Sequence, residues 1–98
     1  MLYWLIYDIS ENRTRSRIVS ICKNYGLFRI QKSSFMGDLS KNKMEMLALE
    51  IKDLSLGEDD CVFIIPSCKS CFSEKEIMGH LEEEKIKEKD FYIIQNDK

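Results

Sequence analysis

The 98-residue chain is predicted to fold as an α+β, ferredoxin-like βαββαβ sandwich with an extra C-terminal strand. Three observations support this fold class. Residues 1–10 and 61–66 are short apolar runs typical of buried strands. Residues 12–25 and 40–54 carry apolar side chains at the spacing of a one-sided helix. Two short alternating segments within residues 27–38 lie between these helices, which completes the order strand, helix, strand, strand, helix, strand.

The composition is that of an ordinary globular domain, with 44% hydrophobic and 33% charged residues. No segment is long and apolar enough to span a membrane and no targeting segment is evident, so we expect a cytoplasmic protein without a membrane partner. The net charge of −2 is unevenly divided: residues 1–49 hold eight Lys/Arg and four Asp/Glu, whereas residues 50–98 hold seven and thirteen. The basic first half is compatible with a polyanionic partner.

The first strand ends in a carboxylate, Asp8. Because successive side chains of a strand point to opposite faces, Asp8 shares a face with Trp4 and Ile6 while Tyr7 points to the other. A charge at the end of an apolar row costs free energy unless something compensates it. Two interpretations are open for Asp8. It can cap the following helix or its turn, or it can be a functional carboxylate.

The predicted first helix begins with three arginines. Arg13 and Arg17 share a face, and Arg15 points roughly 200° away from each neighbour in this row. Cations at a helix N-terminus oppose the macrodipole, which is a mild cost without local benefit. We therefore interpret the arginines as phosphate ligands rather than as a merely solvated surface, although both remain open. Arg29 and Lys32, in the next segment, extend the basic set.

The segment of residues 27–38 is read as two short strands divided near Lys32 and Ser33. Phe35 lies in the second of them, beside the basic residues. Its ring is either part of the core or available to stack on a nucleic-acid base. Capping residues mark the helix ends, because Gly26 stands where a left-handed cap belongs and Ser40 can accept from an orphan N–H.

The four cysteines divide into two kinds. Cys22 falls on the apolar face of the first helix and Cys61 opens an apolar strand, so both are expected to be small core residues. Cys68 and Cys71 have the spacing of half a zinc site or of a redox motif. A structural zinc site needs four ligands, and His80 is the one other strong candidate in the chain. The favoured interpretation is therefore two reduced thiols in a turn.

The second apolar strand, residues 61–66, is predicted to be buried on both faces and to pair with the first. The carboxylates of residues 58–60 precede it, and a solvated turn is favoured there over a cation site. Since the two helices would cover one face of the sheet, something must cover the other. A second copy of the chain is the economical choice, which predicts a homodimer.

Residues 1–80 are assigned to the ferredoxin-like domain, and residues 81–98 to a charged linker and a C-terminal strand. Within the first part, residues 72–80 fit either a short helix or a short strand. Residues 91–95 are strand-like, and a lone apolar strand needs a sheet edge. Addition to the partner subunit's sheet would provide that edge and lock the dimer.

Several motifs carry a resemblance to a known family. The residues YDIS at 7–10, the arginine-rich helix start, the stretch QKSSFMG at 31–37 and an apolar strand running into SCKSC resemble the small CRISPR-associated protein 2. The resemblance covers nearly the whole chain in order and length. Its most specific parts are Tyr7-Asp8 and residues 31–37, and the C-terminal third matches more by layout than by residue.

The resemblance implies a ferredoxin-like homodimer whose C-terminal strand crosses to the partner. It implies that Asp8 is the metal ligand, for Mg²⁺ or Mn²⁺, and that the dimer brings two copies of it face to face. By position in the motif, the other residues implicated in cleavage or binding of nucleic acid are Tyr7, Arg15, Arg17, Arg29 and Phe35. It also implies a dimeric bridge between dimers of the integrase subunit, CRISPR-associated protein 1.

Two functions follow. The first is a spacer-acquisition protein with metal-dependent endonuclease activity on RNA or DNA, in which Asp8 and Tyr7 are catalytic, Asp8 binds the metal, and Arg13, Arg15, Arg17, Arg29, Lys32 and Phe35 bind the nucleic acid. Its weakness is that one carboxylate per chain is a poor ligand set for a nuclease. The alternative is a non-catalytic dimeric DNA-binding adaptor that bridges integrase subunits, with Asp8 in a structural role.

Overall fold

The computed structural model describes residues 1–79. The chain starts with a strand that leads into a helix, continues through a hairpin to a second helix, and returns as a fourth strand followed by one short helix. In order, the elements are β1 (Leu2–Asp8), α1 (Asn12–Asn24), β2 (Phe28–Gln31), β3 (Ser34–Asp38), α2 (Lys41–Lys52), β4 (Cys61–Ser67) and α3 (Lys69–Ser73). This order confirms the prediction for the first six elements.

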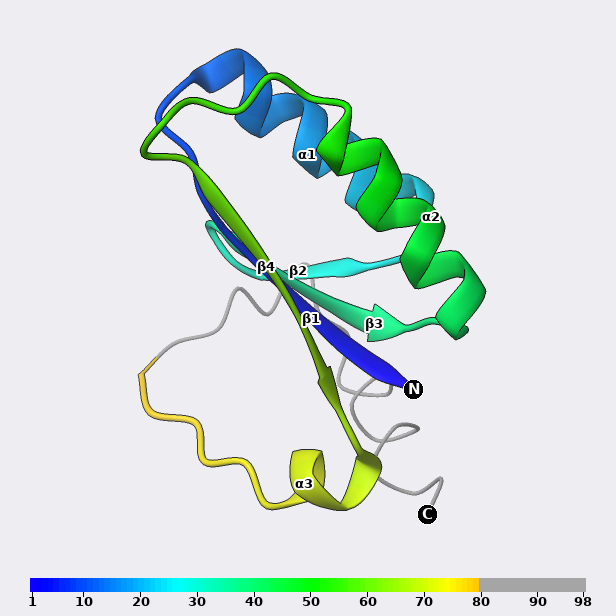
Figure 1. The fold of residues 1–98 in the computed structure, drawn as a ribbon. Coiled ribbons are helices and arrows are strands. Elements are labelled where there is room, and N and C mark those ends of the chain that lie inside the picture. The colour runs from blue at the N-terminus through cyan, green and yellow to red at the C-terminus, as the bar shows by residue number, and fades with distance from the viewer. Residues whose placement is uncertain (80–98) are drawn as a thin grey trace.

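The four strands form one sheet in the order β2-β3-β1-β4, and every neighbouring pair is antiparallel. Helices α1 and α2 lie side by side over one face of this sheet, and α3 lies beyond the far end of β4 (Figure 1). The architecture is the predicted ferredoxin-like sandwich. The predicted linker and C-terminal strand, from residue 81 onward, lie outside the described residues.

The two faces of β1 serve two separate apolar clusters, as the alternation of its side chains predicts. Tyr3, Leu5 and Tyr7 point toward the helices, where they pack with Phe35 and Ile18 among others. On the opposite face, a smaller cluster is closed by α3. Its buried members are Leu2, Ile30, Met36 and Phe72, with Trp4 and Phe28 packed against them.

Capping residues end and begin the helices as predicted. Gly26, directly after the C-cap residue Tyr25, has φ of +81°, a conformation that glycine adopts without the steric cost of a Cβ. Ser40 caps α2, because its Oγ accepts from the Lys43 N–H at 3.1 Å. Gly37 in β3 allows a close approach, since a Cβ there would lie 2.6 Å from Cδ2 of Leu27.

Strand β4 departs from the prediction. It pairs with β1 as expected, but within the described residues it is an edge strand, and Phe63 and Ile65 are 56% and 46% exposed. Cys61 is half-buried rather than a core residue. An apolar run does not distinguish a strand buried on both faces from one with an uncovered face, which is why the prediction failed here.

Cys68 and Cys71, expected to lie in a turn, instead cap and join the short helix α3, which continues to Ser73. The side chain of Phe72 in α3 is 2% exposed, and its ring lies 5.9 Å from that of Trp4, centroid to centroid. This contact covers part of the sheet face that α1 and α2 leave open. None of the helices within residues 1–79 has the length and apolar character needed to cross a membrane.

Candidate functional site

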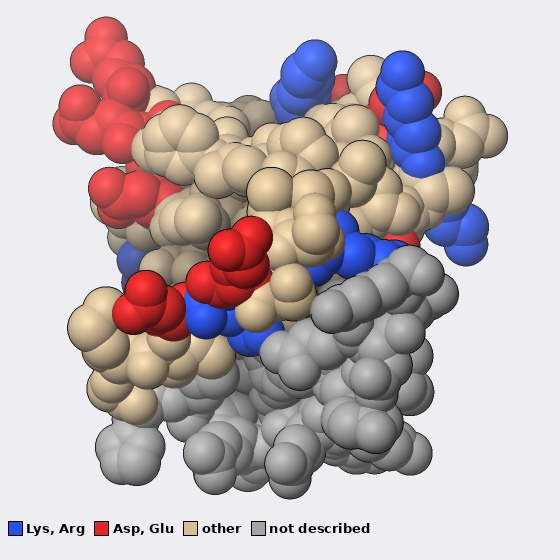
Figure 2. All heavy atoms as spheres, turned by 90° about the horizontal axis from the view of Figure 1, so that it is seen from below, with Lys and Arg blue, Asp and Glu red and all other residues tan. Residues whose placement is uncertain are grey.

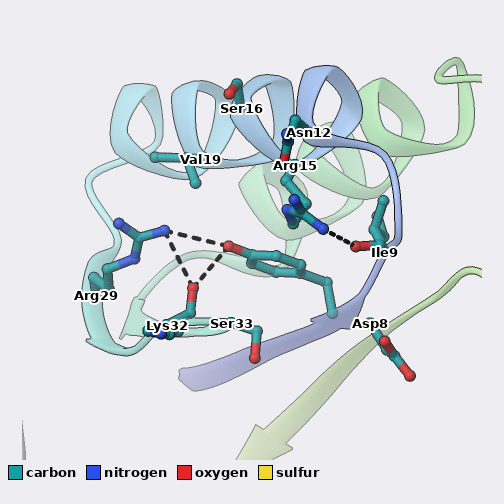
Figure 3. A pocket seen from close by; sticks show the side chains of 10 residues that line it. Asp8, Ile9, Asn12, Arg15, Ser16, Val19, Arg29, Lys32 and Ser33 are labelled. Atoms are coloured by element: carbon teal, nitrogen blue, oxygen red, sulfur yellow. Dashed lines mark hydrogen bonds between the residues drawn. The ribbon is translucent and has the colours of Figure 1, made fainter.

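A hollow of about 740 Å³ lies where the end of β1 meets the first half of α1 and the β2–β3 turn. It collects most of the residues that the sequence singled out. They come from β1, α1, β2 and the β2–β3 turn, and they are Tyr7, Asp8, Arg15, Arg29 and Lys32 (Figure 3). Three of these five carry positive charge, so the hollow is suited to an anionic backbone.

Tyr7 connects β1 to the β2–β3 turn. Its ring is 3% exposed, and its Oη donates a hydrogen bond to the carbonyl oxygen of Lys32 at 2.9 Å. Nη2 of Arg29 donates to the same carbonyl at 3.1 Å and to Oη of Tyr7 at 3.3 Å. These three bonds, drawn in Figure 3, hold the guanidinium in a fixed orientation at the wall of the hollow.

The ring of Phe35 packs against the guanidinium of Arg29. The Arg29 carbon Cζ lies 5.3 Å from the centre of the Phe35 ring, within the range of a cation–π interaction. The ring itself is 0% exposed. Of the two interpretations left open for Phe35, the structure shows the core one, because β3 turns the ring toward the helices. In this position the ring contacts Arg29.

Arg15 has a local role that the sequence did not indicate. Its Nη1 donates to the carbonyl oxygens of Ile9 at 2.7 Å and Ser10 at 3.0 Å, the two residues that follow β1. The arginine thus closes the β1–α1 turn, which offsets its unfavourable place at the helix N-terminus. The expectation that this arginine lacked a local benefit is corrected by these two bonds.

Asp60 also makes hydrogen bonds to the β1–α1 turn, through Ser10. One carboxylate oxygen accepts from the Ser10 N–H at 3.1 Å and from Oγ of Ser10 at 3.4 Å. The other accepts from the Gly57 N–H at 2.8 Å. The hydrogen bonds from Gly57 and Ser10 lower the pKa of Asp60. Sequence reasoning missed this residue, because three adjacent carboxylates resemble a solvated turn and give no signal for the one that is bound.

Asp8 is exposed and stands at the rim of the hollow. Its carboxylate points away from Tyr7 and the guanidinium groups, on the other side of the strand (Figure 3). Within residues 1–79 there is no group of three or more His, Cys, Asp or Glu side chains that could hold a metal ion. One carboxylate is fewer than Mg²⁺ or Mn²⁺ takes from a protein site as a rule, so residues 1–79 of a single chain do not complete the implied metal site.

Arg13 and Arg17 lie elsewhere. They share a face of α1, as predicted, and this face looks toward α2, where both line a groove with Asp53 and Leu54. The predicted basic set is therefore divided, with Arg15, Arg29 and Lys32 at the hollow and the other two arginines apart from it. A helical wheel would separate them, since Arg15 points away from its two neighbours.

Three further residues line the hollow from α1, namely Asn12, Ser16 and Val19. With Arg15 they follow the spacing i, i+3, i+4, i+7 of one helix face. The polar side chains in this stripe were missed because the sequence reasoning followed the arginines and the apolar stripe. Their spacing from Arg15 would have placed them on the same helix face as that arginine.

Comparison with known proteins connects this arrangement to a family. The sequence pattern described as CRISPR associated protein Cas2 matches residues 1–75. The chain belongs to this family. The "CRISPR-associated endoribonuclease Cas2 1" of Archaeoglobus fulgidus is 37% identical over 89 residues, which cover 91% of this chain and 95% of that protein. The resemblance stated from Tyr7-Asp8 and residues 31–37 is thereby confirmed.

Two further Cas2 relatives bear on the fold and on a partner. The crystal structure of Streptococcus pyogenes Cas2 at pH 6.5 superposes with a TM-score of 0.70 at 17% identity, and the match covers 81% of this chain and 100% of that one. It supports the fold alone. A "CRISPR-associated endonuclease Cas1/endonuclease Cas2 fusion" of Thermoproteus tenax is 41% identical over 44 residues, which are 45% of this chain and 17% of the fusion.

Proposed function

We propose that this chain is a CRISPR adaptation protein with metal-dependent endonuclease activity, which cuts phosphodiester bonds of RNA or DNA next to Asp8. The observation that carries the proposal is the position of an exposed carboxylate at the rim of a hollow lined by three cationic side chains. The name of the Archaeoglobus fulgidus relative, an endoribonuclease, supports the same activity. We also propose that the protein acts in the cytoplasm, as expected from the sequence.

In this proposal the cations of the hollow hold the phosphate backbone. Lys32 is exposed and free to follow a phosphate, whereas Arg29 is held by the Tyr7 hydroxyl and the Lys32 carbonyl. A guanidinium fixed in this way loses little conformational entropy when it binds a phosphate. Tyr7 then acts as a positioning residue, because its own hydroxyl is already engaged. Arg13 and Arg17, in their separate groove, are proposed to bind a more distant part of the strand.

A second copy of the chain is proposed to complete the site. The sheet face opposite α1 and α2 presents Phe63 and Ile65, both about half exposed, next to Trp4 and Ile6. Viewed from below, acidic side chains gather at the upper left and Lys and Arg side chains at the upper right, with mostly uncharged surface between them, while acidic and basic side chains lie next to one another nearer the centre (Figure 2). Asp8 points to this same face, so a two-fold dimer packed there gathers two carboxylates near one interface.

The proposed metal ion needs more ligands than the single carboxylate, Asp8, that one chain places at the hollow. Asp8 from each of two copies would provide hard oxygen ligands, the type that Mg²⁺ and Mn²⁺ prefer. Such an ion, when bound, lowers the pKa of a coordinated water and offsets charge on the phosphate. Asp8 contributes the anionic ligand, and the cations of the hollow contribute the orientation of the backbone.

A second candidate is a non-catalytic adaptor that binds DNA as a dimer and bridges subunits of the integrase, CRISPR-associated protein 1. Two observations favour it. The Asp8 carboxylate points away from the cationic groups, and one carboxylate per chain is a poor ligand set. The fusion relative of Thermoproteus tenax, named for both Cas1 and Cas2, supports the partner.

Cleavage of duplex DNA and of single-stranded RNA by the purified chain, with Mg²⁺, Mn²⁺ or EDTA, tests the two candidates. Asp8→Ala is compared with Glu45→Ala, which removes an exposed carboxylate from α2. Cleavage that needs metal, persists in Glu45→Ala and is lost in Asp8→Ala supports the nuclease. Cleavage that survives in Asp8→Ala contradicts it. Binding without cleavage, with intact spacer acquisition by Asp8→Ala, supports the adaptor.

The dimer is tested separately by sedimentation of wild type and Phe63→Asp. Burial of Phe63 in a dimer predicts that the charged variant is monomeric at concentrations where wild type is dimeric. An unchanged sedimentation coefficient would place the interface elsewhere. Lys43→Asp, an exposed change on the helical side of the molecule, is the matched control.

A further inference from the structure

The paired cysteines of α3 lie outside the site described above. Cys68 caps the helix, and its Sγ accepts a hydrogen bond from the Cys71 N–H at 3.3 Å. Oγ of Ser70 lies 3.3 Å from Sγ of Cys68. Both cysteines are exposed. We propose that Cys68 and Cys71 form a thiol–disulfide exchange site that closes reversibly to an intrachain disulfide.

The surroundings assign different roles to the two sulfurs. Hydrogen bonds from Ser70 and Cys71 lower the pKa of Cys68 to about 7, because they stabilise the thiolate. The neighbouring Cys68 sulfur raises the pKa of Cys71 through a hydrogen bond and through charge, with a smaller contribution from Glu74. Cys68 is therefore the attacking thiolate, and Cys71 is the thiol that completes the exchange.

The reaction partner is a small-molecule disulfide such as glutathione disulfide. The Cys68 thiolate attacks one of its sulfurs, which breaks the S–S bond, releases one glutathione thiolate and leaves a mixed disulfide on Cys68. Cys71 then loses its proton to solvent and attacks the Cys68 sulfur, which releases the second glutathione thiolate. The protein gives up two electrons and two protons, and the disulfide reagent accepts the electrons.

The other two cysteines provide internal controls. Cys22 is 0% exposed, and burial raises its pKa to about 12, so its thiol is protonated and shielded. Cys61 is half-buried in β4, without the hydrogen bonds that surround Cys68. We therefore expect exchange to be confined to the pair in α3. A zinc site is the competing use of the two sulfurs, but residues 1–79 supply no third ligand to it.

Closure of the pair affects the contact that α3 makes with the sheet. The first turn of α3 leads directly to Phe72, whose ring packs against Trp4 over the open face. A disulfide between residues 68 and 71 fastens this turn in the arrangement that its hydrogen bonds already hold. After oxidation we expect slower amide hydrogen exchange at residues 72–74 and unchanged exchange at residues 1–67. This inference does not depend on the proposed nuclease activity.

The test uses the full chain, first fully reduced and then exposed to glutathione disulfide at pH 7. Intact mass and peptide mapping follow wild type, Cys68→Ser, Cys71→Ser and, as matched control, Cys61→Ser. Wild type and Cys61→Ser are expected to lose two hydrogen atoms and to show a link between residues 68 and 71. Cys71→Ser is expected to stop at one bound glutathione, on Cys68.

Rates distinguish an activated pair from two ordinary thiols. At pH 7 a thiol with a pKa near 7 is about half ionised, against about 3% at a pKa of 8.5, while its lower basicity reduces its nucleophilicity. The net expectation is that Cys68 in Cys71→Ser reacts about threefold faster than Cys71 in Cys68→Ser. Equal rates, or wild type that accumulates glutathione adducts without the link between residues 68 and 71, would overturn the proposal.

Discussion

Tyr7 and Asp8 are neighbours in sequence, yet they belong to two different regions of the molecule. Tyr7 is buried on the helix side of the sheet, where its hydroxyl makes hydrogen bonds with Lys32 and Arg29. Asp8 is exposed on the opposite side, beyond the apolar row of Trp4 and Ile6. The alternation of a strand therefore separates a region whose polar groups are engaged from one whose groups still face solvent.

The two residues of the Tyr7-Asp8 motif therefore have different surroundings: Tyr7 makes hydrogen bonds within the chain, and Asp8 is exposed. On the helix side, the hydrogen bonds of Tyr7 and the ring of Phe35 fix the guanidinium of Arg29 before any ligand arrives. On the open side, Asp8 and the half-exposed Phe63 are available to a second chain or to an ion. The first region holds the Arg29 guanidinium in place, and the second leaves Asp8 and Phe63 exposed.

The largest expected effect contrasts one phenylalanine from each region. Phe35→Ala removes a fully buried ring and is expected to cost about 3–5 kcal/mol of the free energy of unfolding. Phe63→Ala is expected to cost less than about 1 kcal/mol in the monomer, because the ring is already 56% exposed. Urea unfolding at low protein concentration measures both. Equal losses would contradict the contrast, and Phe35→Leu provides a milder variant should Phe35→Ala fail to fold.

A smaller effect is expected from Tyr7→Phe. The change removes the hydroxyl that donates to the Lys32 carbonyl and accepts from Arg29, at a cost of about 1 kcal/mol in unfolding free energy. Because Arg29 then loses part of its support, affinity for nucleic acid is expected to fall severalfold in a filter-binding assay. Tyr3→Phe, on the same face of β1, is the control. Unchanged affinity would show that Arg29 needs no positioning by Tyr7.

The smallest effect is a pH dependence at Asp60. Its pKa is lowered in the folded state by the hydrogen bonds from Gly57 and Ser10, so its stabilising contribution is present above the unfolded value of about 3.9 and is lost as pH falls through the folded value. Asp60→Asn is therefore expected to destabilise the protein at pH 7, and its difference from wild type is expected to be smaller at pH 3 than at pH 7. Urea midpoints at both pH values check this, with Asp59→Asn as control. A difference from wild type that is as large at pH 3 as at pH 7 would contradict the assignment.

Much of the fold followed from the sequence because the two periodicities are strong. The alternation in β1 and the helical stripe ending at Gly26 were both confirmed. The exposed face of β4 was not predicted, because an apolar strand looks the same whether its second face is covered within the chain or by another copy. The sequence left two interpretations open for Phe35, core or base stacking, because neighbouring cations do not indicate which face of the sheet the ring lies on.

The sequence predicted which residues line the site, but it did not predict the hydrogen bonds that hold them in place. Asp8, Arg15, Arg29 and Lys32 do line one hollow. The hydrogen bonds of Asp60 to the turn after β1 join residues 50 positions apart. Those of Arg15 to the same turn span six positions or fewer, but they depend on how the turn folds back over the helix start. Local spacing carries no information on such contacts.

The proposal assigns cleavage to Asp8 and binding to the cations of the hollow, and variants of one residue from each region separate the two activities. Binding and cleavage of one labelled strand are measured across salt concentrations for wild type, Asp8→Asn and Lys32→Gln. Asp8→Asn is expected to bind as wild type does and to cleave at least about 100-fold more slowly, as for loss of a group that acts in the transition state. Lys32→Gln is expected to lower the salt dependence of binding by about 0.7–0.9 in log–log slope and to cleave normally when saturated. Cleavage by Asp8→Asn at the wild-type rate would contradict the account.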